Sequence, residues 1–204
     1  VMVHDGAILP EVPVARIPAD NLSELGAFSS KLLLYAAGGN SGEWMNRALL
    51  VADDEWGQRN WHETEHTVDC ERIAEEVIPR RIDREKFYMV EYPWPPGPWT
   101  PEGQHPEKPE AREAFIETLN RGFQFFLYQG HGAADQIAHE VLMLGEDVSS
   151  LDNGSRLPVS FWATCDVGHF DNPGGDAIGE TLVLHPAGGC IASVAATRGT
   201  YGSA

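Results

Sequence analysis

Two residues of this chain have the types and the setting for nucleophilic chemistry, His131 and Cys165. His131 follows the apolar run 123–128 and is flanked by glycines, and Cys165 follows a second apolar run, 157–164. A thiol beside an imidazole is the minimum set for cysteine catalysis, because the histidine removes the thiol proton and later protonates the leaving amine. The pattern therefore indicates a Cys/His nucleophilic site.

Both residues are expected to lie just beyond the carboxyl ends of buried strands. A short apolar run that ends at glycine is typical of a strand buried on both faces. The interval between His131 and Cys165 fits a crossover helix and a return strand, so we expect neighbouring strand ends. The backbone N–H groups of Gly132 and Cys165, which have no predicted ladder partners, are candidates for an oxyanion hole.

The rest of the chain predicts alternating helices and strands. Apolar periodicity and capping residues indicate helices at 21–37, 68–78, 110–120, 134–144 and 176–184, and strands at 48–52, 87–92, 123–128, 157–164 and 189–196. In the first helix, the apolar side is expected to carry Leu22, Leu25, Leu32, Leu33 and Tyr35. Such alternation is typical of an α/β fold with a mostly parallel sheet and helices on both faces.

In a sheet of that kind, the carboxyl ends of the strands form the ligand-binding edge. Four predicted strands end at Asp53-Asp54, His131, Cys165 and Arg198, so these side chains are expected at one edge. Asp53 and Asp54 can orient His131, although capping or loop-solvating roles fit them equally well. Arg198 is expected to pair with an acidic neighbour, and Cys70 and Cys190 to belong to the core.

Length and composition suit one globular domain covering residues 1–204. The formal net charge of −17 argues against nucleic acid or an anionic membrane as partner, because both require a basic surface. No apolar stretch is long enough to span a bilayer. The proline-rich stretch 93–109 predicts a long exposed loop. Three scattered cysteines do not form a disulfide framework.

A set of motifs in a fixed order resembles the gingipain family of caspase-fold cysteine peptidases. The motifs are Gly130-His131-Gly132, Ala163-Thr164-Cys165, Gly168-His169-Phe170-Asp171, the segment 10–18, the strand 49–54, Leu119-Asn120-Arg121-Gly122 and the stretch 188–198. In the Ala-Thr-Cys and Phe-Asp-Asn-Pro region the chain is most similar to the sortase-like peptidase of the type IX secretion system. The resemblance spans most of the chain.

The resemblance implies a caspase-like three-layer sandwich and a cysteine endopeptidase that acts on polypeptides through an acyl-enzyme thioester. It implies His131 as the catalytic histidine, Cys165 as the nucleophile, and Gly132 with Cys165 as oxyanion donors. A sortase-like relative would allow transpeptidation. The resemblance also implies a secreted, cell-surface or periplasmic location, and a partial domain with further segments at both ends.

Specificity and ion binding stay open at this stage. Arginine-specific members place an acidic residue in the loop after the Asp53-Asp54 strand, where this chain has Glu55, Glu63, Glu65 and His66. Glu55, with Asp53 and Asp54, is a candidate orienting or substrate-loop residue. No catalytic metal or cofactor is expected, although a structural calcium ion fits the acidic loops.

Two alternatives to a peptidase are compatible with the sequence. The first is a catalytically inactive caspase-fold scaffold that binds a partner, because a fold alone does not define a function. The second, less favoured, is a zinc-binding domain that uses His131, His139, Cys165 and His169.

Overall fold

The computed structural model describes residues 2–4, 7–9, 12, 14–38, 41–54, 56–57, 61–62, 64–96 and 106–200. The helices are α1 (Leu22–Ala36), η1 (Glu43–Asn46), α2 (Glu65–Arg72), η2 (Ile73–Val77), η3 (Met89–Glu91), α3 (Pro109–Asn120), η4 (Gly145–Ser150) and α4 (Ile178–Leu184). The strands are β1 (Met2–His4), β2 (Ala7–Leu9), β3 (Arg47–Ala52), β4 (Trp56–Gly57), β5 (Trp61–His62), β6 (Asp83–Tyr88), β7 (Phe125–Gln129), β8 (Gln136–Ile137), β9 (Met143–Leu144), β10 (Val159–Ala163) and β11 (Ala192–Ala195). Of these, η1, η3 and η4 are 3₁₀ turns, and η2 extends α2 as a π-helix.

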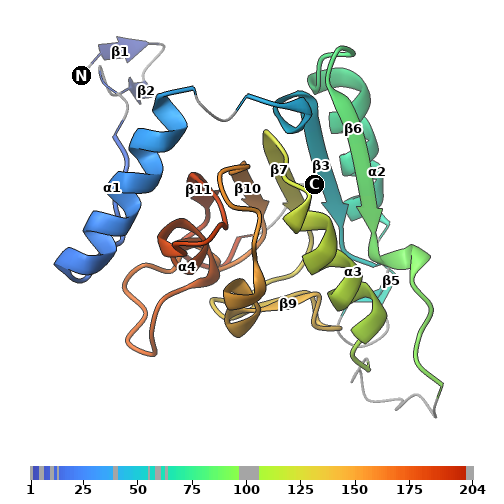
Figure 1. Cartoon of the computed structure of the whole chain (residues 1–204). Helices are drawn as coiled ribbons and strands as arrows, with labels where there is room; N and C mark the ends of the chain where they lie inside the picture. Colours follow the sequence, from blue (N-terminus) through green and yellow to red (C-terminus); the bar gives the residue numbers. More distant parts are fainter. Residues whose placement is uncertain are drawn as a thin grey trace.

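Five strands form the central sheet in the order β11-β10-β7-β3-β6 (Figure 1). Every neighbouring pair in this sheet is parallel, so all five carboxyl ends lie at one edge. The chain builds the sheet outward in one direction from β3 to β6 and in the other from β7 to β11. The strand order therefore reverses between β3 and β7, and such a switch point is where open α/β sheets bind ligands.

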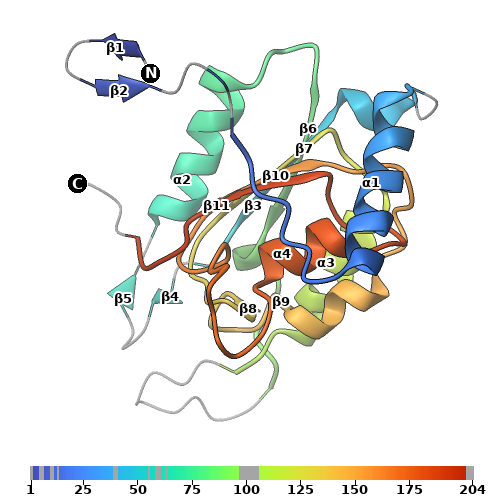
Figure 2. The same ribbon diagram turned by 90° about the vertical axis from the view of Figure 1, so that its left-hand side faces the viewer.

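Helices cover both faces of the sheet, as predicted (Figure 2). Alternation along β3 explains this arrangement, because Leu49 and Val51 pack with α3 and α4 in the larger core cluster. Leu50 and Ala52 point the other way and pack against Cys70 of α2. β3 is consequently buried on both faces, and the observed architecture is an α/β fold with a parallel sheet between helices.

Helix α1 begins as predicted but faces the protein differently. The Asn21 side chain caps the helix by accepting the N–H groups of Ser23 and Glu24. Phe28 and Lys31 are buried, whereas the expected apolar side is wrong: Leu22, Leu25, Leu32 and Leu33 are exposed. The reason is Lys31, whose Nζ lies within 3.3 Å of four carbonyl oxygens at and beyond the end of α4, those of Leu182, Val183, His185 and Gly188.

The predicted helix at 134–144 is also wrong. This segment folds as the antiparallel pair β8–β9, joined by a turn in which Ala138 and Val141 have positive φ angles of 62° and 59°. A left-handed backbone at two non-glycine positions is incompatible with a helix. The crossover between β7 and β10 is therefore a hairpin followed by η4. The second predicted strand is displaced as well, because β6 begins at Asp83 and ends at Tyr88.

The proline-rich stretch 93–109 falls partly outside the described residues, since 97–105 are not described. In its described part, 93–96 and 106–109, Lys108 is buried at 2% exposure, and the other residues are partly or fully exposed. Among the described helices, none combines the length and apolar character needed to cross a bilayer.

Candidate active site

His131 and Cys165 follow the ends of two neighbouring strands, β7 and β10. In the parallel register Gln129 pairs with Ala163, and each of the two candidate residues lies two positions beyond that pair. The N–H of Gly130 still donates to the carbonyl oxygen of Ala163 at 3.3 Å, so the strands remain side by side up to the loops. The prediction that the two strands are neighbours is therefore confirmed.

Cys165 is half-buried and is contacted by the last described residue. Its Sγ lies 3.2 Å from the backbone nitrogen of Thr200, which donates to it, and 3.4 Å from the Thr200 carbonyl oxygen. The next residue, Asp166, has φ of 57°, so the backbone turns sharply directly after the thiol. Left-handed backbone at a non-glycine residue is strained and is found preferentially at functional sites.

The other two cysteines are core residues, as predicted. Cys70 and Cys190 are buried, and all three cysteines are free thiols. Burial raises the pKa of the Cys70 thiol to about 12 and that of Cys190 to about 11. Both therefore stay protonated and unreactive at neutral pH, and the half-buried Cys165 is the accessible thiol of the three.

Gly132 allows the histidine loop to approach the cysteine loop. A Cβ atom at this position would lie 2.6 Å from Oγ1 of Thr164 and 3.4 Å from the carbonyl oxygen of Cys165. Any larger residue would force the two loops apart. Close packing of the two loops therefore explains why glycine follows His131, which the sequence motif alone does not explain.

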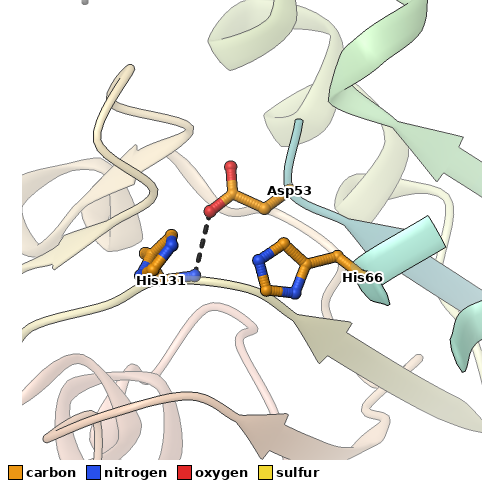
Figure 3. Close-up of side chains that lie close together, drawn as sticks. All are labelled: Asp53, His66 and His131. Carbon is orange, nitrogen blue, oxygen red and sulfur yellow. Dashed lines mark hydrogen bonds between the residues drawn. The ribbon is translucent and has the colours of Figure 1, made fainter. Parts of the chain in front are cut away.

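Asp53 supports His131 through the backbone. Its carboxylate is buried, and its Oδ2 accepts the backbone N–H of His131 at 2.9 Å (Figure 3). The hydroxyl of Tyr128 lies 3.2 Å from the same oxygen and 2.8 Å from the carbonyl oxygen of His131. Burial raises the pKa of Asp53, against the opposing effect of the hydrogen bond from His131. A Cβ at Gly130 would lie 2.4 Å from the Cβ of Asp53, so glycine permits this contact.

Asp54 pairs with a buried lysine. The Nζ of Lys108 lies 3.0 Å from Oδ2 of Asp54 and 3.0 Å from the carbonyl oxygen of Met89, which accepts a hydrogen bond from it. Glu140 is fully buried near this pair, and neither of its carboxylate oxygens has a hydrogen-bond partner among the described residues. Burial, followed by the charges of Asp54 and Asp53, raises the pKa of Glu140 to about 8.

Two further histidines, His66 and His139, lie beside His131. The ring of His66, near the start of α2, meets the His131 ring edge-on with 5.4 Å between centroids. The His139 ring is 4.4 Å from that of His131. The sequence offered His139 as a zinc ligand, but its position beside the His131 ring was missed because a helix was predicted where the chain forms the β8–β9 hairpin. One feature of the sequence could have identified His66 as a site residue, namely its position in the acidic loop after the Asp53-Asp54 strand.

Other sequence-predicted residues have clear positions. Arg198 pairs with an acidic neighbour as expected, its guanidinium lying 2.8 and 2.9 Å from the carboxylate of Asp171. His169 also contacts Asp171, at 3.4 Å. The predicted zinc set of His131, His139, Cys165 and His169 does not form a cluster of ligand atoms in the part of the chain that the structure describes. Glu55 and Glu63 lie outside the described residues.

Comparison with known proteins agrees with the α/β fold. The sequence model of peptidase family C25 matches residues 1–204, so the chain belongs to this family of cysteine peptidases, the gingipain family. The resemblance seen in the motifs is thereby confirmed. A search of curated proteins gives no match.

Solved structures with a similar fold include gingipains. The crystal structure of the Arg-specific cysteine proteinase gingipain R (RgpB) matches with a TM-score of 0.62 at 18% identity, over 90% of this chain and 39% of that chain. A complex of Porphyromonas gingivalis RgpB pro- and mature domains gives 0.61 at 17% identity, over 90% and 40%. A structure described as a protease gives 0.62 at 18% identity, over 90% and 36%. The chain thus spans about two fifths of the length of the proteins it resembles.

Proposed function

We propose that this protein is a cysteine endopeptidase in which Cys165 is the nucleophile and His131 is the general base and acid. The observation that carries the proposal is the register of β7 and β10, which sets the two residues at equivalent positions beyond adjacent strand ends. Membership of peptidase family C25 supports the same class of reaction.

The reaction follows from the chemistry of the two side chains. His131 accepts the proton of Cys165, and the thiolate sulfur attacks the carbonyl carbon of the scissile peptide bond. The tetrahedral intermediate collapses as His131 gives that proton to the leaving amine, and a thioester to Cys165 remains. Water, deprotonated by His131, then attacks the thioester carbon and releases the acid and the free thiol.

Two backbone N–H groups can stabilise the oxyanion of each tetrahedral intermediate. In the described part of the chain, neither the N–H of Gly132 nor that of Cys165 donates to a protein acceptor. Both N–H groups belong to loops at the carboxyl edge of the sheet. The two loops can lie close together because Gly132 has no Cβ, which would otherwise collide with the side chain of Thr164. Such preformed donors act most strongly when they are aimed at the developing charge.

Asp53 is a positioning residue in this scheme. Because its carboxylate binds the backbone of His131, it fixes the loop that carries the imidazole. The glycines at 130 and 132 then allow close packing on both sides of that loop.

The acyl group can also pass to an amine, which would give transpeptidation as in sortase-like relatives. We propose hydrolysis of polypeptides as the main reaction, outside the cytoplasm as in the secreted relatives that the motifs resemble. Product analysis with and without an added amine nucleophile separates the two fates of the thioester.

The test uses the full-length protein and an acyl-trapping, thiol-directed probe. The probe is expected to label Cys165 and to spare Cys70 and Cys190, which serve as internal controls because both are buried. Cys165→Ala is expected to abolish labelling and peptide cleavage. Undiminished cleavage by this variant would show that another group is the nucleophile. A probe that never reacts with Cys165 would favour the binding scaffold instead.

A further inference from the structure

Three side chains meet at the switch point of the sheet, those of Asp53, His66 and His131 (Figure 3). They come from the end of β3, the first turn of α2 and the loop after β7. Each offers one potential ligand atom, a carboxylate oxygen or an imidazole nitrogen, and these atoms all lie within 4.8 Å of one another. Residues far apart in the sequence thus converge on a single point beside the proposed catalytic base.

We propose that Asp53, His66 and His131 form a binding site for a divalent transition metal, with zinc as the best match, and that the bound metal reversibly inhibits the enzyme. Two imidazoles and one carboxylate are a donor set that suits zinc and related first-row ions, and three protein ligands leave a coordination position open.

The geometry is close to what a metal requires. Ligand atoms at roughly 2.0–2.2 Å from zinc lie about 3.3 Å apart in a tetrahedral site. The ligand atoms of Asp53, His66 and His131 lie within 4.8 Å of one another, so small side-chain rotations would bring them to that separation. The carboxylate is already anchored by the His131 N–H and by the Tyr128 hydroxyl. Outer hydrogen bonds of this kind orient a ligand and strengthen its binding. Oδ2 accepts the His131 N–H with one lone pair, and the single proton of the Tyr128 hydroxyl can turn to the nearer carbonyl oxygen of His131, at 2.8 Å, which frees the second lone pair for the metal.

Access and charge also favour a cation at this point. Asp53 is buried, whereas both imidazoles are half-buried, so the metal would enter from the side of the two rings. The chain carries a formal net charge of −17, which draws cations toward the protein.

The second group of candidate ligands, Asp53, Asp54 and Glu140, is a weaker choice. All three of its carboxylates are buried. Lys108 already supplies a cation there, with its Nζ 3.0 Å from Asp54. A hard ion such as calcium would need six to eight oxygen ligands, which this group does not offer.

Metal binding would switch off the proposed peptidase through His131. Coordination occupies the nitrogen lone pair that otherwise accepts the proton of Cys165, so the thiolate does not form by this route. Removal of the metal by a chelator restores the lone pair. The inhibitory effect rests on the proposed function, but the binding of the metal does not.

The decisive measurement is zinc binding by isothermal titration calorimetry to the full-length Cys165→Ala protein. Removal of the thiol excludes zinc binding by a Cys165–His131 pair. One zinc ion per chain is expected at this site. Introducing His66→Gln into this variant is expected to weaken zinc binding by at least about tenfold. Loss of a residue that only hydrogen-bonds to a metal ligand typically costs that much affinity, and His66 is itself a proposed ligand. Adding His169→Gln, a histidine outside the cluster, is the matched control and should leave the affinity unchanged.

Histidine-ring NMR of the Cys165→Ala protein gives a second readout that needs no substitution at His66. Zinc should shift the ring resonances of His66 and His131 and leave those of His185 in place. The proposal is overturned if zinc does not bind, if His66→Gln keeps the parent affinity, or if the shifted rings are other histidines. In the protein with Cys165, zinc should inhibit cleavage and a chelator should restore it. Zinc binding without any cleavage activity would refute the peptidase proposal and leave the metal site intact.

Discussion

Glu140 is expected to make the stability of this protein fall as the pH rises. Its carboxyl group is fully buried, has no hydrogen-bond partner among the described residues, and has a pKa of about 8 instead of 4.5. Between these two values the folded protein keeps the proton while the unfolded chain loses it. The folded state then binds more protons than the unfolded state, so the free energy of unfolding decreases with increasing pH in this window. Outside the window, Glu140 adds no pH dependence to the free energy of unfolding.

The size of the effect follows from the same two values. At about 1.36 kcal/mol per pKa unit, the interval from 4.5 to about 8 corresponds to about 5 kcal/mol. Glu140→Gln keeps the shape of the protonated side chain and does not ionise. The variant should therefore match the parent near pH 4.5 and be more stable by several kcal/mol above pH 8.

Urea unfolding of parent and variant across this pH range measures the difference directly. The exposed Glu117→Gln on α3 is the matched control, for which no such pH-dependent gain is expected. If Glu140→Gln were less stable than the parent at high pH, an ionised Glu140 would have to be held by a partner, and the reasoning from uncompensated burial would be wrong.

Two other substitutions test the elements around the site. Lys108→Met leaves the buried carboxylate of Asp54 without its cation and should lower the free energy of unfolding by about 3–5 kcal/mol, whereas the same change at Lys86, in an exposed ion pair, should cost less than about 1 kcal/mol. Equal losses in urea unfolding would contradict the burial argument. Gly132→Ala should sharply reduce cleavage because its Cβ would lie 2.6 Å from a side-chain oxygen of the cysteine loop, while Gly26→Ala, with open space around the added Cβ, should leave kcat/KM unchanged. Full activity of the Gly132 variant would show that the two loops can separate without loss of function.

The strands around the site could be predicted because their signals are local. An apolar run ending at glycine or aspartate predicted β3 and β7, and the same logic located β10 before Cys165. The helix prediction for 134–144 failed because the turn there depends on left-handed residues held by tertiary contacts. Its local sequence carries no glycine or proline signal for that turn. The edge strand β6 began earlier than expected, since its charged first half gives no apolar pattern.

The burial of charged groups was the other point at which sequence reasoning failed. Lys31 and Lys108 read locally as solvent-exposed residues, yet each is held by distant partners, the carbonyl oxygens around the end of α4 in one case and Asp54 in the other. Such compensation depends on which groups face each other after folding. No window of the sequence contains both partners, so no local pattern can predict them.

By itself, the sequence determined the family, the alternation of strands and helices, and the placement of one thiol and one histidine just beyond neighbouring strand ends. These features depend on residue type and spacing along the chain. Only the tertiary structure decided that Asp53 holds the backbone of His131 and that His66 and His139 lie beside its ring. It also decided that Glu140, whose carboxylate has no hydrogen-bond partner among the described residues, lies buried near Asp53 and Asp54. Those contacts form because the parallel sheet brings segments that are distant in the sequence together at its switch point. Packing fixes their positions in space, and the order of residues along the chain does not show which segments will meet.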